Sequence, residues 1–469
     1  MTENLWQLSA TETAHHIKKG NISCEAVMTS HLDRLDQTRI LNAVTTRFDD
    51  DALQVAREAD KTLAQGNEIG PLHGVPVTIK ENTDQAGLAT SHGILDFKDN
   101  FAEGNSPLVK NLLNAGAIPL GRTNTPEFAW RFHTENELFG ATLNPWNAKL
   151  TPGGSSGGAA SSVAVGVGCI AQGNDLGGSI RGPAYCCGIT GIRPTKGRIP
   201  FYNDTSMFER PMTIQLSSVQ GPLTRNVADA KLAFEMMQGY SNLDAWSMPK
   251  FNIKQPKLKK IALFKDPLCL GIHSSVNAAL DEAANAYREA GYVVEIATPP
   301  SLKEINETYL SLLITELSII KETIINQHGS GQLRRVMSHY QKIRAPLDLS
   351  GYAKSLAKRS HFHREWDQFQ LEYQIILSPV LTTAPFRAGE DLESVEAMLD
   401  ISDSAACLTA MNFLDLPAMS VPTQVREQNV PIGVQVIGPR YGENLCFLAA
   451  QVLEDAFGCP SDELLDVIS

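Results

Sequence analysis

Two glycine–serine clusters bracket a run of small, apolar residues in segment 152–183, PGGSSGGAASSVAVGVGCIAQGNDLGGSIRGP. The first cluster covers residues 153–158 and the second covers residues 177–179. Glycine permits backbone angles that other residues avoid, and its lack of a side chain lets a substrate approach bare N–H groups. Such surroundings suit a serine nucleophile beside an oxyanion hole. One such run could be a flexible loop, but two runs around an apolar segment indicate a folded site.

A lysine directly follows an apolar stretch upstream of these clusters. The stretch is GVPVTI, residues 74–79, and it ends at Lys80. A buried strand over residues 74–80 would hold Lys80 partly out of water, and desolvation lowers the pKa of a lysine. A neutral amine can then act as a general base. Taken alone, a lysine at a strand end is more often solvated.

Together with other motifs, these segments resemble the amidase signature family of serine hydrolases. The resemblance covers most of the chain and follows the family's order. It is carried by GVPVTIKEN (74–82), GAIPLGRTNTPEFA (116–129), LNPWN (143–147), TPGGSSGGAA (151–160), GNDLGGSIRGPA (173–184), GITGIRPTKGRI (188–199), LPAMSVP (416–422) and PIGVQVIGPRYGE (431–443).

The resemblance implies a Ser–cis-Ser–Lys triad and no metal or organic cofactor. Ser179 would be the nucleophile, Ser155 the bridging serine on a cis peptide bond, and Lys80 the base. The backbone N–H groups of Leu176, Gly177, Gly178 and Ser179 would form the oxyanion hole. A hydroxyl both donates and accepts, so Ser155 could relay the proton of Ser179 to Lys80 and then return it to the leaving amine. Water would hydrolyse the resulting acyl-enzyme.

Three neighbours of the triad have supporting roles by the same resemblance. Asp175 and Arg181 flank the nucleophile loop and would brace it through hydrogen bonds and an ion pair, while Ser156 would hydrogen-bond within its own loop. From the sequence alone, two solvated loop charges explain Asp175 and Arg181 equally well.

Other nucleophile patterns fit the chain less well. Residues 153–157 and 154–158 both match the G-x-S-x-G elbow of α/β-hydrolases, but that motif requires a preceding strand, and residues 144–152 have the composition of a loop. The glycine run lacks the Gly-Lys-Ser/Thr ending of a P-loop. A cysteine nucleophile is the remaining rival, although Cys169 lies in an apolar run where thiols are mostly inert.

Composition is consistent with an enzyme that stays in the cytoplasm. The 469 residues are 43% hydrophobic, enough for a large core, and the net charge of −12 argues against nucleic acid or an anionic membrane as a partner. No apolar run approaches the ~20 residues of a membrane span, and the N-terminus does not resemble a signal sequence. The eight scattered cysteines indicate free thiols in a reducing compartment. A homodimer is expected only because dimers are common in the family.

The element pattern predicts a single α/β domain over residues 1–469, with a mixed, mostly parallel central β-sheet covered by helices on both faces. Residues 1–65 would form an N-terminal helical region, 70–222 the signature core, and 223–469 the rest of the sheet and the pocket helices. Predicted helices cover 10–36, 51–65, 106–116, 227–240 and 276–291, and a buried core helix covers 159–171. Predicted strands cover 74–80, 117–121, 259–264, 292–297 and 374–378. Residues 241–257 are interpreted as a surface loop.

Three classes of function remain open at this point. A stand-alone amidase would cleave a small carboxylic amide such as an aryl-acetamide. The glutamine-hydrolysing subunit of a tRNA-dependent amidotransferase would need a partner subunit, but residues 123–130, TNTPEFAW, are more similar to stand-alone amidases. A non-catalytic binding protein is disfavoured by the intact Lys80, Ser155 and Ser179. Candidate segments for an acyl pocket are 125–140 (Phe128, Trp130, Phe132), 200–212 (Phe201, Tyr202, Met207, Phe208) and 303–345.

Overall fold

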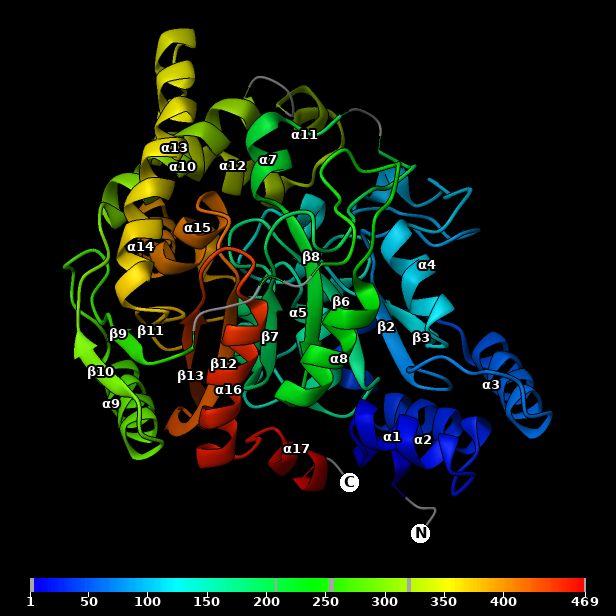
Figure 1. Ribbon diagram of the computed structural model, residues 1–469. Coiled ribbons are helices and arrows are strands. Elements are labelled where there is room, and N and C mark those ends of the chain that lie inside the picture. The colour runs from blue at the N-terminus through cyan, green and yellow to red at the C-terminus, as the bar shows by residue number, and fades with distance from the viewer. Residues whose placement is uncertain (1–3, 207–208, 252, 254–256, 319–321, 468–469) are drawn as a thin grey trace.

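An 11-stranded mixed β-sheet runs through the whole molecule, with helices packed on both of its faces (Figure 1). The computed structural model describes residues 4–206, 209–251, 253, 257–318 and 322–467. The strand order is β1-β3-β2-β6-β8-β7-β12-β13-β11-β9-β10. The strands are β1 (Val44–Arg47), β2 (Pro76–Lys80), β3 (Ile118–Thr123), β6 (Ile170–Asp175), β7 (Thr190–Arg193), β8 (Val219–Thr224), β9 (Lys260–Leu263), β10 (Val293–Ile296), β11 (Ile375–Pro379), β12 (Ala418–Glu427) and β13 (Val430–Ile437). The short pair β4 (Glu135–Asn136) and β5 (Gly140–Ala141) lies outside this sheet.

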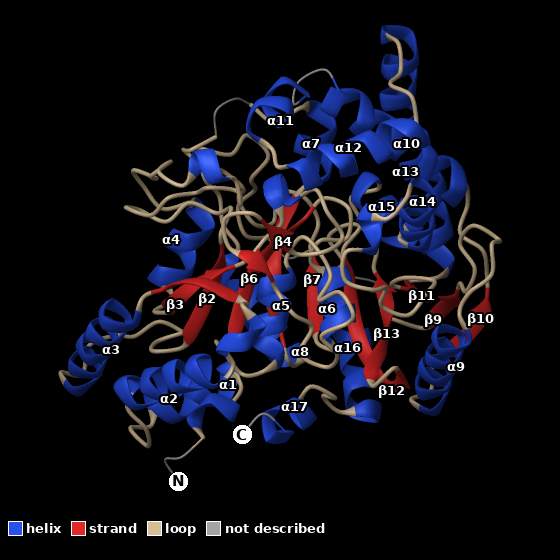
Figure 2. Ribbon diagram, turned by 180° about the vertical axis from the view of Figure 1, so that it is seen from behind, coloured by secondary structure: helices blue, strands red, loops and turns tan. Residues whose placement is uncertain are grey.

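Helices cover the sheet and also gather beyond one end of its strands. In Figure 1, α8 and α16 lie in front of the sheet, whereas α5 lies in front in the opposite view of Figure 2. Both views place α7, α11 and α12 beyond the same end of the strands. The helices are α1 (Ala10–Lys18), α2 (Cys24–Gln37), α3 (Asp49–Ala64), α4 (Pro107–Asn114), α5 (Gly157–Ala164), α6 (Arg181–Cys187), α7 (Met212–Ser217), α8 (Val227–Met237), α9 (Ser274–Glu289), α10 (Leu302–Glu316), α11 (Glu322–His328), α12 (Gly331–Ile343), α13 (Leu349–Glu372), α14 (Val395–Ser404), α15 (Ala406–Phe413), α16 (Glu443–Phe457) and α17 (Asp462–Val467).

The predicted α/β domain with a mixed central sheet is confirmed, but parallel pairing does not dominate it. Parallel pairs occur in β3-β2-β6 and in β11-β9-β10. The middle of the sheet, from β6 through β8, β7, β12 and β13 to β11, pairs antiparallel. One reason is a tight hairpin between β12 and β13, where Gln428 and Asn429 both have positive φ, the geometry of a two-residue turn.

Two predicted helices are divided in the structure. The helix expected over 10–36 is α1 followed by α2, because Gly20 adopts a left-handed φ of 70° and Ser23 caps a new helix. The carboxylate of Asp60 also accepts the N–H groups of Cys24 and Glu25 at the start of α2. The core helix expected over 159–171 is α5, a turn, and the first residues of β6. The remaining predicted helices and strands are present with boundaries shifted by a few residues. Within the described residues, no helix combines the length and apolar character needed to cross a bilayer.

Candidate active site

Lys80 ends β2 with a side chain that is completely buried. Its Nζ lies 2.7 Å from Ser155 Oγ, 3.0 Å from Ser156 Oγ and 2.8 Å from Asn174 Oδ1. Asn174 is on β6, the parallel neighbour of β2, so both side chains project near the carboxyl edge of this part of the sheet. Burial lowers the pKa of Lys80 well below its usual value, and the Asp175 and Glu81 carboxylates only partly oppose this effect. Burial therefore favours the neutral amine of Lys80 over the charged ammonium.

Ser155 lies in the loop that leads into α5, and the Gly154–Ser155 peptide bond is cis. The side chain of Ser155 is fully buried against Lys80. The next residue, Ser156, joins this loop to the second glycine–serine cluster, because its N–H donates to the backbone carbonyl of Ser179 at 3.2 Å. The two clusters, separated in sequence, are therefore directly bonded in the fold.

Ser179 lies in the turn between β6 and α6, and the carboxylate of Asp175 organises this turn. Asp175 Oδ1 accepts the N–H of Gly178 at 2.8 Å, and its Oδ2 accepts the N–H of Ile180 at 3.1 Å. Gly178 has a φ of 104°, and a Cβ there would meet Leu408 Cδ1 at 2.5 Å. Only glycine fits this position without a shift of the turn.

Asp175 and Arg181 form a buried ion pair of 2.9 Å, and neither side chain is exposed to solvent. Burial by itself would raise the pKa of Asp175, but Arg181 outweighs it and holds this pKa well below its usual range. Arg181 also donates to Gln435 Oε1 and to Asn412 Oδ1, both at 2.7 Å. The pair is thus part of a buried network that ties the turn to β13 and α15, which is inconsistent with two solvated loop charges.

The N–H groups expected to bind an oxyanion differ in their partners. The N–H of Gly178 is bonded to Asp175. Among the described residues, the N–H groups of Leu176, Gly177 and Ser179 have no acceptor. The carbonyl of Leu176 accepts the hydroxyl of Tyr309 from α10, which fixes the direction of that peptide. Three of the four expected donors are therefore unoccupied by the described part of the protein itself.

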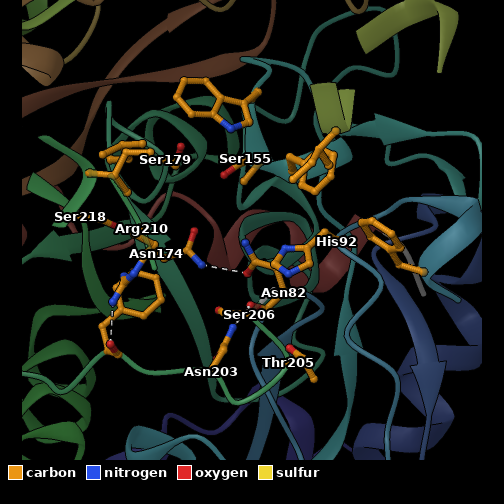
Figure 3. A pocket seen from close by; sticks show the side chains of 18 of the residues that line it. Asn82, His92, Ser155, Asn174, Ser179, Asn203, Thr205, Ser206, Arg210 and Ser218 are labelled. Atoms are coloured by element: carbon orange, nitrogen blue, oxygen red, sulfur yellow. Dashed lines mark hydrogen bonds between the residues drawn. The ribbon is translucent and has the colours of Figure 1, made fainter. Parts of the chain in front are cut away.

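Two cavities meet at Ser179. The first, which we call the asparagine cavity, measures about 150 Å³ and is shown in Figure 3. It is lined by Asn82, His92, Phe97, Asn100, Phe128, Ala129, Trp130, Ser155, Asn174, Leu176, Ser179, Phe201, Asn203, Thr205, Ser206, Arg210, Ile214, Ser218 and Ile324. The second, the leucine cavity, is lined by Ala129, Trp130, Arg131, Phe132, Leu176, Gly177, Ser179, Leu310, Leu313, Ile314, Leu317, Tyr340 and Thr409. Ser155 lines only the asparagine cavity. Among the described residues, no hydrogen bond joins Ser155 Oγ to Ser179 Oγ.

All three segments proposed from the sequence for the acyl pocket contribute residues to these cavities. Phe128 and Phe201 line the asparagine cavity, Phe132 lines the leucine cavity, and Trp130 lines both. Residues of α10 and α12, within the expected 303–345 region, complete the leucine cavity. Tyr202 is not among the described lining residues, and Met207 and Phe208 lie outside the described residues.

Sequence reasoning missed Asn82, Asn174 and Arg210. Asn174 Nδ2 donates to Asn82 Oδ1 at 2.8 Å, which orients Asn174 Oδ1 toward Lys80. Asn82 stands in the KEN end of the strand motif and Asn174 directly precedes Asp175, so their motif positions were the available signal. Arg210 had no such signal.

Within the part of the chain that the structure describes, neither cavity has residues suited to thiol or metal chemistry. No cysteine is among the described residues that line either cavity. Burial raises the pKa of Cys169 to about 12. Among the described residues, no group of three or more His, Cys, Asp or Glu side chains could hold a metal ion.

Comparison with known proteins gives the family. A family model described as Amidase matches residues 26–447. The chain belongs to the amidase signature family. It is 39% identical to an indoleacetamide hydrolase of Bradyrhizobium diazoefficiens over 99% of this chain and 89% of that protein. It is 30% identical to a glutamyl-tRNA(Gln) amidotransferase subunit of Natranaerobius thermophilus, over 96% of both chains. A bacterial aryl acylamidase structure of the amidase signature family superposes with a TM-score of 0.84, at 25% identity and 98% coverage of both chains.

Membership of the amidase family identifies the protein as an amide-hydrolysing enzyme. This identification excludes a non-catalytic scaffold. The α/β-hydrolase elbow is excluded by the fold, because that motif requires a strand directly before the serine and residues 142–156 contain no strand.

Proposed function

We propose that this amidase cleaves the C–N bond of a small carboxylic amide through Ser179, Ser155 and Lys80, by way of an acyl-enzyme. The observation that carries the proposal is the buried contact of 2.7 Å between Lys80 Nζ and Ser155 Oγ, at the wall of a cavity that Ser179 also lines. A base, a relay hydroxyl and a more exposed hydroxyl are thus available in one place.

The hydrogen bonds around Lys80 suit a neutral amine. A neutral Nζ has two N–H groups and one lone pair. Its N–H groups can donate to Asn174 Oδ1 and Ser156 Oγ, which leaves the lone pair to accept the hydroxyl proton of Ser155. Ser155 Oγ is then free to accept the proton of Ser179 as the nucleophile attacks.

Attack of Ser179 Oγ on the amide carbon makes an oxyanion, which the N–H groups of Leu176, Gly177 and Ser179 would stabilise. We leave Gly178 out of this set because its N–H is bonded to Asp175. As the C–N bond breaks, Ser155 gives a proton to the leaving nitrogen and regains one from Lys80. Water then attacks the acyl-enzyme, with the same relay as base, and releases the acid.

For the substrate, we propose an amide with an apolar, aromatic-bearing acyl group of aryl-acetamide size. The leucine cavity supports this choice, because leucine, isoleucine and aromatic side chains make up most of its wall. Relatives named indoleacetamide hydrolase and aryl acylamidase support it as well.

The first test is ammonia release by the purified chain from phenylacetamide, indole-3-acetamide, an aliphatic amide and glutamine. We expect release from the aryl-acetamides and its loss in Ser179→Ala, with the circular dichroism spectrum unchanged. Release from glutamine alone would instead favour an amidotransferase subunit. Undiminished turnover by Ser179→Ala would exclude Ser179 as the nucleophile.

A further inference from the structure

The two cavities at Ser179 correspond to the two halves of an amide. This inference rests on the proposed function, in which Ser155 protonates the leaving nitrogen. Because Ser155 lines the asparagine cavity and is not among the described residues of the leucine cavity, the leaving group faces the asparagine cavity. The acyl group then extends into the leucine cavity.

The asparagine cavity is larger than an ammonia leaving group requires. Its volume is about 150 Å³, whereas a space of ~10–15 Å³ already holds a single water molecule. The space on the leaving-group side therefore accommodates an amine with several heavy atoms.

Arg210 is the charged residue among the described residues that line this cavity, and one donor of its guanidinium has no partner among them. Its Nη2 donates to the carbonyl of Phe201 at 2.8 Å, and its guanidinium stacks 3.8 Å from the centre of the Phe201 ring. Its Nη1 is buried and has no hydrogen-bond partner within the described part of the chain. Figure 3 shows Arg210 among the side chains that line this cavity, apart from Ser155. A buried guanidinium donor without an acceptor is costly unless a ligand supplies one.

The nearby acids do not supply that acceptor. Asp244 acts on Arg210 electrostatically, but its two carboxylate oxygens accept the N–H groups of Phe201 and Trp246, at 2.8 and 3.0 Å. Glu209 is exposed, and among the described residues neither acid forms an ion pair with Arg210. None of the described residues that line the cavity is acidic. The charge of Arg210 and the lack of acidic groups among the described lining residues therefore favour binding of an anion in this cavity.

We propose that the enzyme also hydrolyses N-acyl amino acids, with the carboxylate of the leaving amino acid bound by Arg210. Ser179 Oγ bonds to the acyl carbon, the C–N bond breaks, and the amino acid leaves with a proton from Ser155. Water then releases the acid, so that N-acyl amino acid and water become carboxylic acid and amino acid.

The test compares N-phenylacetylglycine with N-propyl-phenylacetamide, which has a leaving group of similar size and no charge. Phenylacetate release is measured for both. We expect kcat/KM to favour the glycine conjugate by roughly 10- to 100-fold, the range of a charge-assisted hydrogen bond. Arg210→Gln should abolish this preference, and Arg210→Lys, which keeps the charge, should retain part of it. The exposed Arg288→Gln is the control and should leave the preference unchanged.

Equal kcat/KM for the two compounds in the wild type, or a preference that survives Arg210→Gln, would overturn the assignment. Phenylacetamide separates this failure from failure of the proposed function. An enzyme that cleaves phenylacetamide without preferring the glycine conjugate is an amidase with no carboxylate site. Thermal melting checks that the variants are folded. If Arg210→Gln is unstable, the test uses Arg210→Lys instead, through its ratio of kcat/KM for N-phenylacetylglycine to kcat/KM for N-propyl-phenylacetamide.

Discussion

At the scale of single residues, the protonation state of Lys80 decides whether the proposed relay can work. Water is excluded from its amino group, which is fully buried, and the hydrogen bonds of Nζ go to hydroxyl and amide oxygens. Among the described residues, no carboxylate is bonded to it. Such surroundings favour the neutral amine over the cation, as a general base requires.

The corresponding prediction is a pH profile. Because the neutral form of Lys80 is active and its pKa is lowered, kcat/KM for phenylacetamide should rise as pH increases through that pKa and then level off well below pH 10.5. Lys80→Met should lower kcat by about 10²- to 10⁴-fold, the usual contribution of a general base, and should remove this rise. The exposed Lys98→Met is the control. A rise that persists unchanged in Lys80→Met would assign it to another group.

At the scale of elements, the sequence predicted those strands and loops whose structure depends on residues close together in the chain. The apolar run 74–79 predicted the strand that delivers Lys80, and the glycine–serine clusters predicted the two loops that carry Ser155 and Ser179. The strand order and the antiparallel centre of the sheet depend on contacts between distant segments and were not predictable from local pattern. The same holds for the contact of Asn174 with Lys80, 94 residues apart, which exists only because β2 and β6 pair.

The Asp175–Arg181 ion pair holds the turn between β6 and α6, and this role can be tested directly. Asp175→Asn keeps an acceptor for the N–H of Gly178 but leaves Arg181 as an uncompensated buried charge. We expect a loss of about 3–5 kcal/mol in the free energy of unfolding. We also expect a lower kcat, because the N–H of Ile180, beside Ser179, loses the carboxylate oxygen that accepts it. Urea denaturation and phenylacetamide kinetics measure the two effects.

The matched control for this variant is an exposed ion pair. Lys358 and Glu304 lie 2.7 Å apart with about half of each side chain exposed, so Lys358→Met should cost less than about 1 kcal/mol. If Asp175→Asn cost no more than the control, the buried pair would not anchor the turn.

At the scale of the whole molecule, burial of neutral imidazoles makes stability depend on pH. Burial, with Arg225 nearby, lowers the pKa of His31 on α2 to about 3. Burial also lowers the pKa of His133 to about 4 and that of His363 on α13 to about 3. These groups lie in separate parts of the fold, so each is expected to act independently on the unfolding equilibrium.

The sign follows from proton binding. Between the unfolded pKa of about 6.5 and the lowered folded pKa, the unfolded chain binds more protons than the folded chain, so stability falls as pH decreases. For His31 alone, this effect lowers the free energy of unfolding at pH 5 by roughly 2 kcal/mol relative to pH 7. We therefore expect the loss of unfolding free energy between pH 7 and pH 5 to shrink by about that amount in His31→Asn, whatever the variant's stability at pH 7. The exposed His15→Asn should leave the loss unchanged. An equal loss in wild type and His31→Asn would mean that folding does not lower the pKa of His31.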